Sequence, residues 1–358
     1  MKAAVCYEFG KPLVIEEIVL DTPQANEVRI KLKACAICHS DILHMDGAWG
    51  GELPAVFVHE AAGIVVEVSP DVTLTNVGDP VVVTLIRSCG RCFYCDKSEP
   101  QLCEKTFRLE KESPLHNEAG QPMFQALRTG TFAKEVVVHE SQVVPVPADV
   151  SMDSASLIAC GIIGYGAVVK TAKVPVGSSV VVIGAGGVGL NSIQGAALSG
   201  ATPLIAIDLL DHKLDVAKFL GATHGFNPKQ RNVAEQVLAL TNGRGADYVF
   251  VTAGSEMAMH QGLALLRQVG TLILVGMPAS GVKLAIEAAD FANDSLHVMG
   301  SKMGSTRERI DVPKLIALYR DGRLKLDELV TKRYPLEEIN EAVAAVKRGD
   351  AVRNVIVF

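Results

Sequence analysis

The sequence predicts two domains, one mostly β and one built on a doubly wound parallel α/β sheet. A chain of 358 residues is longer than a single hydrophobic core usually fills. Short Val- and Ile-rich runs separated by turn signals fill residues 1–85, which is typical of a β domain. From Val180 onward, apolar runs alternate with helical patterns, which indicates parallel strands joined by helices.

Composition narrows the class of protein. The chain is 49% hydrophobic and 21% charged, as in globular α/β proteins. We expect no nucleic-acid partner, because the formal net charge is −6 and no basic run is present. We expect no membrane span, because no run of about 18 apolar residues is present. The N-terminal residues lack the apolar stretch of a secretory signal, so a cytoplasmic location and small-molecule partners are expected.

The strands of the β domain follow alternating or Val/Ile-rich patterns. Turn signals such as Asp21-Thr22-Pro23 and Val77-Gly78-Asp79-Pro80 separate them. The expected strands cover residues 2–7, 13–18, 27–34, 63–68 and 80–84.

Cys38 and His59 are candidate metal ligands in this domain. A thiolate and an imidazole suit zinc, and Asp41 and Glu60 are acids near enough in sequence to hydrogen-bond these ligands. A catalytic zinc keeps one position open, so one more Cys or His is expected, and Cys160 in a distant apolar segment is the candidate. The alternative is that each is a packed core residue, which is common for a single Cys or His in an apolar segment.

Four more cysteines, within fifteen residues, form a second candidate metal site. Cys89, Cys92 and Cys95 are each separated by two residues, and Cys103 follows after seven more. Four thiolates close a tetrahedral site and leave zinc no open position, so this zinc is expected to be structural. An iron–sulfur cluster or disulfides are the alternatives.

The segment that follows is less regular. Residues 104–130 are polar and show no sustained period, so a long loop is expected there. Residues 131–138 return to a strand pattern, and a helix that carries Cys160 is expected to begin at Met152.

Residues 180–189 read Val-Val-Val-Ile-Gly-Ala-Gly-Gly-Val-Gly, the pattern of a dinucleotide-binding turn. The strand before the glycines, the helix expected over 190–199 and a second strand over 204–207 that ends at Asp208 complete this pattern. Glycines let a pyrophosphate approach the helix N-terminus, and an acid at this distance can accept hydrogen bonds from a ribose. Asp208 favours NAD over NADP, because its carboxylate would repel a 2′-phosphate. The alternative is a chance glycine-rich turn.

Helices and strands continue to alternate after Asp208. Helices are expected over 213–220, 233–240, 258–266, 312–320 and 336–347, and strands over 248–252, 271–275 and 352–358. The last strand is expected to rejoin the first domain, because its pattern fits nothing open in a completed parallel sheet.

These motifs together resemble the zinc-containing alcohol dehydrogenases of the medium-chain dehydrogenase/reductase family. The resemblance rests on Cys38-His39-Ser40-Asp41, on His59-Glu60, on the four-cysteine spacing and on the glycine pattern, and it covers essentially the whole chain. It implies a GroES-like catalytic domain over 1–161 with a structural zinc lobe at 89–103, a Rossmann NAD-binding domain over 162–302, and a return to the catalytic domain over 303–358.

The resemblance also implies the ligands of two zinc ions per chain. Cys38, His59 and Cys160 would hold the catalytic zinc, which is the known Cys₂His ligand set of this family. The structural zinc would take Cys89, Cys92, Cys95 and Cys103.

Further roles follow from the resemblance alone. His39 would face the cofactor pyrophosphate, Ser40 would pass on the alcohol proton, and Asp41 would orient His59. The other residues implied in cofactor binding are Gly184, Gly186, Gly187, Val188, Gly189, Asp208, Lys213 and Arg353, the last as a second pyrophosphate contact. Trp49 and Leu85 occupy positions that line the alcohol pocket of the family.

The chain departs from the family pattern at three places. Val58 replaces the glycine that usually precedes the ligand histidine, and residues 160–164 are one residue short and lack the usual threonine. The histidine that often ends the proton relay falls at Leu43, with His44 next to it, so the relay is expected to end in water.

Three functions remain open at this point. The preferred one is an NAD-dependent alcohol dehydrogenase that works reversibly on a primary or secondary alcohol. The second is a glutathione-linked formaldehyde dehydrogenase or a polyol dehydrogenase of the same family, for which Arg108 offers the only anion anchor after Cys103. The third is a zinc-bearing NAD-binding protein with a structural or sensory role.

The expected assembly is a homodimer, with a tetramer as the alternative. The sheet edge near residues 271–275 and the apolar stretch 277–289 are expected to pair with a second subunit. The long loop at 104–130 resembles that of the dimeric members of the family.

Overall fold

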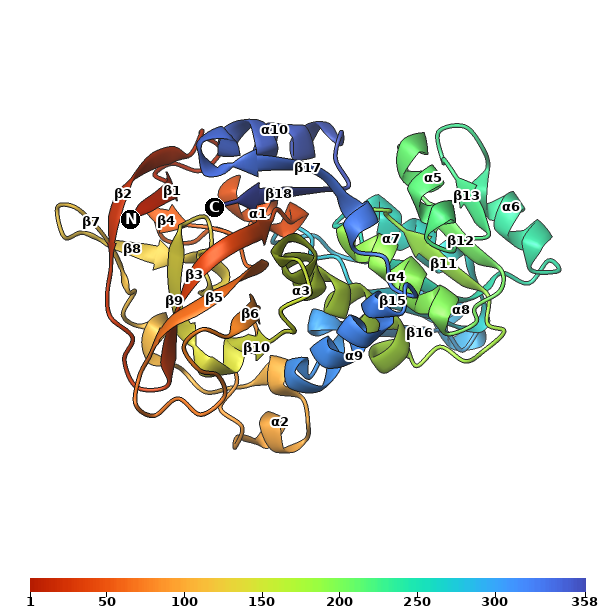
Figure 1. Cartoon of the computed structure of the whole chain (residues 1–358). Coiled ribbons are helices and arrows are strands. Elements are labelled where there is room, and N and C mark those ends of the chain that lie inside the picture. The colour runs from red at the N-terminus through yellow and green to blue at the C-terminus, as the bar shows by residue number, and fades with distance from the viewer. The chain divides into compact units, whose positions relative to one another are not determined.

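A computed structural model describes all 358 residues, and the chain divides into two compact units (Figure 1). The first unit comprises Met1–Ala159, Arg307–Gly322 and Leu326–Phe358. The second comprises Cys160–Thr306 and Arg323–Lys325. The C-terminal residues therefore belong with the N-terminal ones.

The first unit contains a closed barrel and a separate seven-stranded sheet. The barrel runs β1 (Lys2–Cys6), β2 (Val14–Leu20), β7 (Leu115–Asn117), β8 (Pro122–Gln125) and β4 (Ala55–Val56). The sheet runs β10 (Val143–Pro145), β6 (Pro80–Val83), β5 (Ala61–Val68), β3 (Glu27–Ala36), β18 (Arg353–Val357) and β17 (Val330–Pro335), and β9 (Glu135–His139) also pairs with β3. The strands expected in the first 85 residues are confirmed within two residues at each end, whereas the two-residue strand β4 is not among the predicted ones.

A single apolar core fills this unit, because alternate strand residues point inward. Ile30 and Leu32 of β3, Val65 of β5 and Val136 of β9 are at most 1% exposed. Burying such side chains stabilises the fold by about 1.5–3 kcal/mol each. This core fixes the ends of β3 and β5, from which the metal-binding side chains project.

The long loop expected over residues 104–130 is wrong in part. Two of the barrel strands, β7 and β8, lie inside it, and they pair with each other antiparallel. The two strands have only three and four residues and include Pro, His and Asn. Segments this short do not show the alternating pattern that predicts a strand. Their pairing with β2 and β4 closes the barrel.

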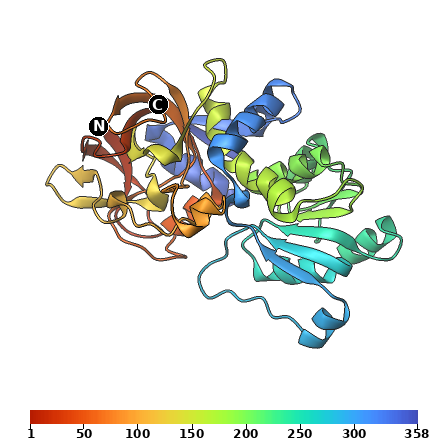
Figure 2. The same ribbon diagram turned by 90° about the horizontal axis from the view of Figure 1, so that it is seen from below.

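The second unit contains a six-stranded sheet in which neighbouring strands pair parallel. Its order is β13 (His224–Phe226), β12 (Leu204–Ile207), β11 (Val180–Ile183), β14 (Ala246–Val251), β15 (Leu266–Leu274) and β16 (His297–Gly300). Figure 2 shows helices on both faces of this sheet. They are α4 (Gly187–Leu198), α5 (Asp211–Phe219), α6 (Val233–Leu240) and α7 (Glu256–Ala264), with the short α8 (Ala288–Asn293) after β15. The predicted doubly wound sheet is confirmed.

The expected sheet edge near residues 271–275 is wrong. These residues lie in β15, which pairs with β14 on one side and with β16 on the other. The edge strand is β16, whose residues are mostly exposed. Its four residues read His-Val-Met-Gly, which is too short a pattern to predict a strand.

Helix α3 (Met152–Gly166) begins where the sequence predicts and carries Cys160. A π-helical segment over Ala167–Ala172 extends it. The stretch Met152–Ala172 is long and apolar enough to cross a membrane, but 72% of its most apolar window is buried inside the protein, as in a core helix.

The C-terminal residues complete the first unit. Helices α9 (Glu308–Arg320) and α10 (Ile339–Arg348) form close to the predicted positions. The last strand, β18, pairs antiparallel with β3 and parallel with β17, so it rejoins the β domain as predicted. Figure 1 shows α10 beside these two strands.

Candidate active site

Cys38, His59 and Glu60 gather into one group of possible metal ligands. Cys38 follows the end of β3 and is the N-cap of α1 (His39–Met45), while His59 and Glu60 stand directly before β5. One ligand atom from each residue lies within 4.8 Å of the other two, and all three side chains are buried. The pairing of β3 with β5 brings these segments together, although about twenty residues separate them.

Asp41 holds both predicted zinc ligands in place. Its Oδ1 lies 2.8 Å from Nδ1 of His59, and its Oδ2 accepts a hydrogen bond of 2.9 Å from the Cys38 backbone N–H. Asp41 is the third residue of α1, so its carboxylate closes the first turn of the helix on the N-cap backbone. With Nδ1 engaged, the Nε2 atom of His59 is the one available to a metal.

The electrostatics of this group favour a positive charge. Burial opposes protonation of His59, yet the nearby Asp41 carboxylate and the Cys38 side chain raise the His59 pKa well above its usual value. The same negatively charged groups would favour a metal cation bound at Nε2 of a neutral His59. The donor set of thiol, imidazole and carboxylate therefore fits a zinc ion.

Glu60 pairs with a residue from the other end of the chain. One of its oxygens accepts a hydrogen bond from the Arg353 guanidinium, and both side chains are almost completely buried. Its other oxygen, Oε1, has no hydrogen-bond partner and lies 3.7 Å from Nε2 of His59. An orphaned carboxylate oxygen beside a ligand histidine is a further sign that this group is built around a cation.

The other predicted residues of this site lie on the same few elements. His39 and Ser40 are the first two residues of α1, and both are at least partly exposed. Trp49 follows α1, and its ring lies 5.7 Å from that of His44. Leu85 follows β6 by two residues. Cys160 lies on α3 at the start of the second unit and is 1% exposed.

Val58 adopts a backbone conformation that is rare for its residue type. Its φ is +76°, in the left-handed region that a β-branched residue enters only under strain. Its carbonyl oxygen accepts hydrogen bonds from the Thr131 N–H at 3.0 Å and the Thr129 hydroxyl at 2.9 Å. These contacts explain how the turn before His59 keeps its shape where the family usually has glycine.

The four-cysteine lobe forms the second metal-binding group. The Sγ atoms of Cys89, Cys92, Cys95 and Cys103 lie within 4.8 Å of one another. All four are free thiols, so the disulfide alternative is wrong. A short helix, α2 (Phe93–Asp96), positions Cys95, and the backbone N–H of Cys89 points to the Cys103 sulfur at 3.3 Å.

The thiols of the lobe differ in acidity. Backbone N–H groups of Cys95 and Glu104 lower the pKa of Cys92 to about 6, whereas burial raises the pKa of Cys103 to about 12. Four thiolates this close repel one another unless a cation lies between them. The lobe therefore fits a closed structural zinc site.

The glycine-rich segment has the geometry of a nucleotide-binding turn. It connects β11 to α4, whose N-cap is Gly186. Gly184 has φ +98°, and a Cβ on Gly189 would lie 1.7 Å from the Gly184 oxygen, so both positions require glycine for the protein's own packing. A Cβ on Gly186 would meet no protein atom within 4 Å, which leaves open space over the helix N-terminus. This turn therefore fits a dinucleotide.

Asp208 lies beside this turn at the end of β12. Its carboxylate accepts hydrogen bonds from the backbone N–H groups of Ala185, at 2.7 Å, and Leu210, at 3.0 Å. Lys213 is on the first turn of α5, five residues further on. Thr252, which the sequence analysis did not identify, donates to the Gly184 oxygen at 2.7 Å and comes from the end of β14. No spacing rule could have found Thr252, because parallel strand pairing alone brings it to the turn.

The chain combines an α/β unit that has a nucleotide-binding turn with a β unit that has two separate groups of possible metal ligands. This is the architecture of a metal-dependent dehydrogenase. Comparison with known families agrees with this class. Residues 24–148 match the family model described as an alcohol dehydrogenase GroES-like domain, and residues 187–321 match the model described as a zinc-binding dehydrogenase.

Individual relatives cover the whole chain. An S-(hydroxymethyl)glutathione dehydrogenase of Saccharomyces cerevisiae is 35% identical over 99% of this chain and 95% of its own length. An alcohol dehydrogenase zinc-binding domain protein from Burkholderia ambifaria has 32% identity and a TM-score of 0.94, with 100% and 98% of the two chains covered. The benzyl alcohol dehydrogenase of Acinetobacter calcoaceticus has 30% identity and a TM-score of 0.91, with 100% and 99% covered.

The chain belongs to the zinc-dependent alcohol dehydrogenases of the medium-chain dehydrogenase/reductase family. It is an oxidoreductase that acts on CH–OH donors, and its two units are the GroES-like and Rossmann domains of that family.

Proposed function

We propose that this enzyme reversibly oxidises a primary or secondary alcohol to an aldehyde or ketone with NAD as hydride acceptor. The observation that carries the proposal is the Asp41-centred group, in which one carboxylate holds both the Cys38 backbone and the His59 imidazole. Such support is needed for a catalytic metal site that must keep its ligands oriented while one position stays open. A structural or sensory protein would not require it.

We propose that Cys38, His59 and Cys160 hold the catalytic zinc and that the four-cysteine lobe holds the structural one. When bound, the catalytic zinc acts as a Lewis acid that lowers the pKa of an alcohol hydroxyl, and the nicotinamide accepts the hydride. Glu60 supplies a buried negative charge beside His59. The charge balance of the site depends on Arg353, because it pairs with that carboxylate.

The remaining residues bind, orient and move protons. Ser40, on the partly exposed first turn of α1, receives the alcohol proton and passes it to water, because Leu43 offers no imidazole to continue a relay. His39 and Arg353 bind the cofactor pyrophosphate together with the turn from Gly184 to Gly189. Asp208 and Lys213 bind the adenosine ribose. Trp49 and Leu85 line the alcohol pocket and exclude water from it.

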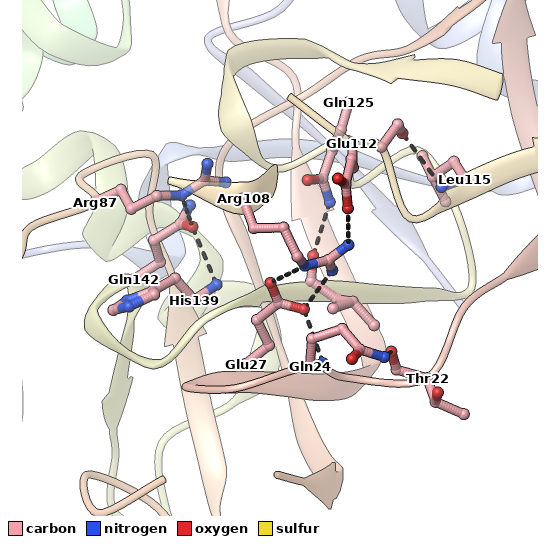
Figure 3. Close-up of polar contacts among 12 residues, drawn as sticks. Thr22, Gln24, Glu27, Arg87, Arg108, Glu112, Leu115, Gln125, His139 and Gln142 are labelled. Atoms are coloured by element: carbon pink, nitrogen blue, oxygen red, sulfur yellow. Dashed lines mark hydrogen bonds and ion pairs between the residues drawn. The ribbon is translucent and has the colours of Figure 1, made fainter. Parts of the chain in front are cut away.

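A glutathione-linked formaldehyde dehydrogenase is the second candidate, because the relative from Saccharomyces cerevisiae carries that name. Arg108 is the basic residue of this chain that could anchor glutathione, but its guanidinium is already paired with carboxylates of the protein. Its guanidinium donates to both oxygens of the buried Glu27, at 2.9 and 2.6 Å, and lies 3.6 Å from Glu112 (Figure 3). Glu27 also raises the Arg108 pKa, so this charge is balanced within the protein. The arrangement favours a simple alcohol as substrate.

NADH formation across a panel of alcohols tests this proposal. Zinc-loaded enzyme is assayed with primary, secondary, aromatic and polyol substrates, and with formaldehyde in the presence and absence of glutathione. We expect the highest kcat/KM for a simple or aromatic alcohol and no stimulation by glutathione. If only the mixture of formaldehyde and glutathione is oxidised, the second candidate is correct. We also expect a cytoplasmic location.

A further inference from the structure

A cavity of about 680 Å³ lies in the first unit, away from the Cys38 and His59 group. Three segments distant in sequence form most of it: the four-cysteine lobe with Lys105, residues 139–141 at the end of β9, and the start of α9. Asn26 and Leu74 complete the lining. Its volume falls in the range of about 300–1,000 Å³ that is usual for small-molecule sites. Cys89 and Cys95 on its wall belong to the four-cysteine lobe, and none of the lining residues has a role in the reaction described above.

Four permanently charged cations line this cavity: Arg91, Lys105, Arg307 and Arg309. Arg91 lies in the lobe and Lys105 follows it, while Arg307 precedes α9 and Arg309 is the second residue of that helix. Arg91, Lys105 and Arg309 are exposed, Arg307 is half-buried, and none of the four forms an ion pair within the chain. Most other arginines of the first unit have a carboxylate partner, such as Glu135 for Arg29 and Glu60 for Arg353.

The two acids on the cavity wall do not balance these cations. Glu140 accepts hydrogen bonds from the Thr73 and Leu74 backbone N–H groups, at 2.8 and 3.1 Å. Glu308 is buried and accepts a hydrogen bond of 2.7 Å from Thr84. Burial raises the pKa of Glu308 to about 8, so this carboxyl group is largely protonated near neutral pH. With zinc bound, the four thiolates of the lobe would leave two negative charges beside the cavity, and together with Glu140 these offset three of the four cations, so one net positive charge remains.

His139 adds a neutral hydrogen-bond donor to the wall. Its Nδ1 accepts from the Ser141 backbone N–H at 3.1 Å, so the ring hydrogen is on Nε2. Burial and the nearby Arg87 guanidinium lower the His139 pKa to about 4, which keeps the ring neutral. Figure 3 shows His139 beside Gln142. The side-chain oxygen of Gln142 accepts hydrogen bonds from the His139 backbone N–H and from the Arg87 guanidinium. These hydrogen bonds hold the His139 ring and the Gln142 side chain in place.

We propose that this cavity binds a small organic anion that carries at least two negatively charged groups, such as phosphates or carboxylates. None of the four cations has a carboxylate partner, although Lys105 lies 5.1 Å from the centre of the Phe107 ring, so like charges repel one another along the wall of the cavity. A ligand with two or more anionic groups relieves this repulsion, and charge-assisted hydrogen bonds from arginine fit both phosphate and carboxylate oxygens. The bound anion would join the lobe to α9 through Arg91 and Arg307.

Isothermal titration of the zinc-loaded full-length protein tests the proposal. The probes form a charge series: fructose 1,6-bisphosphate, fructose 6-phosphate and fructose, with tricarballylate as the carboxylate counterpart and inorganic phosphate as the minimal ion. We expect saturable binding of about one molecule per chain for the bisphosphate, the tricarboxylate or both. Which of these two binds more tightly identifies the anionic group that the site prefers. Fructose is expected not to bind.

Matched double variants locate the binding. Arg307→Gln with Arg309→Gln should weaken the tighter-binding anion at least tenfold. Arg231→Gln with Arg244→Gln, which removes two exposed cations of the second unit, should leave it unchanged. If the first variant does not fold, Arg91→Gln with Lys105→Gln replaces it. No saturable binding of any probe up to about 10 mM, or equal weakening by both double variants, would overturn the proposal.

Discussion

Oδ1 of Asp41 lies 2.8 Å from Nδ1 of His59 in a site where both side chains are almost fully buried. The same carboxylate holds the Cys38 N–H through its other oxygen. One acid thus sets the orientation of both residues of the first unit that we propose as ligands of the catalytic zinc. Asp41 also closes the first turn of α1 by accepting a hydrogen bond from the N-cap backbone. The same side chain therefore stabilises both the start of the helix and the proposed metal site.

Asp41→Asn is expected to weaken the catalytic zinc site and leave the structural one intact. An amide cannot supply the negative charge that favours a cation at His59, and it can accept from only one of the two N–H groups. Loss of such support typically costs about 10–100-fold in metal affinity. Zinc content after dialysis against a weak chelator should fall from two ions per chain toward one.

The control for this variant is Asp46→Asn, which removes an exposed carboxylate paired with Lys347 just after α1. It should retain both zinc ions. Equal zinc loss in the two variants, or none in Asp41→Asn, would show that Asp41 does not support the ligands.

Asp208 is expected to make the enzyme prefer NAD. Replacing it with Ser removes the charge that would repel a 2′-phosphate, and should raise the ratio of kcat/KM for NADP to that for NAD by about tenfold, or about 1.4 kcal/mol. Asp208→Asn separates the loss of charge from the loss of the hydrogen bond to Ala185. Asp215→Ser, an exposed acid on α5, is the control. A wild type that uses both cofactors equally would contradict the role of Asp208.

Glu308 is expected to make the stability of the first unit depend on pH. Its folded pKa of about 8 lies above its ordinary value of 4.5, because burial disfavours the charged form. Below about pH 4.5 the group is protonated in both the folded and the unfolded chain, and its contribution to the free energy of unfolding is fully present. As the pH rises from there toward 8, the free energy of unfolding falls by up to about 1.4 kcal/mol per pH unit. The melting temperatures of wild type and Glu308→Gln are measured from pH 5 to pH 9. The wild-type value minus the variant value should decrease as the pH rises over this range. A difference that stays constant would mean that Glu308 ionises normally.

The enzyme is expected to be a dimer formed through the β16 edge of the Rossmann sheet. This edge strand exposes Met299, and the segment before α8 exposes Met277, Val282 and Ile286. Exposed apolar side chains beside an unpaired edge favour a symmetric contact with a second copy. Size exclusion with light scattering should give the mass of two chains for wild type and of one for Met299→Lys.

Met257→Lys is the control for the dimer, because it places the same charge at an 80% exposed position on α7. It should leave the dimer intact. A mass of four chains that does not change on dilution would contradict the dimer.

The sequence was most informative where a pattern repeats or a spacing is diagnostic. Helix α6 forms over the predicted residues, Val233–Leu240, and the turn from Gly184 to Gly189 forms between a strand and a helix as predicted. The four cysteines of the lobe converge as their spacing predicts. Each of these features depends on residues close in sequence.

Features that depend on distant segments were not visible in the sequence. The pairing of Glu60 with Arg353 requires β18 to lie beside β3, and no local pattern specifies which carboxylate a buried arginine will meet. The sequence predicts a loop at strands β7 and β8, because the conformation of these short strands depends on the rest of the barrel. The edge strand β16 is not predicted from the sequence, for the same reason. The cavity beside the lobe combines segments that are far apart in the sequence, so composition alone could not reveal it.

The most direct test of the account measures zinc content and alcohol-dependent NADH formation on the same preparations of wild type, Cys38→Ala and Cys103→Ser. Wild type should contain two zinc ions per chain and be active. Cys38→Ala should keep its fold and one zinc but lose at least a thousandfold in kcat, while Cys103→Ser should mainly lose folding yield, because its site is structural. A Cys38→Ala enzyme that still forms NADH at the wild-type rate, or a fully active wild type with only one zinc, would contradict the account.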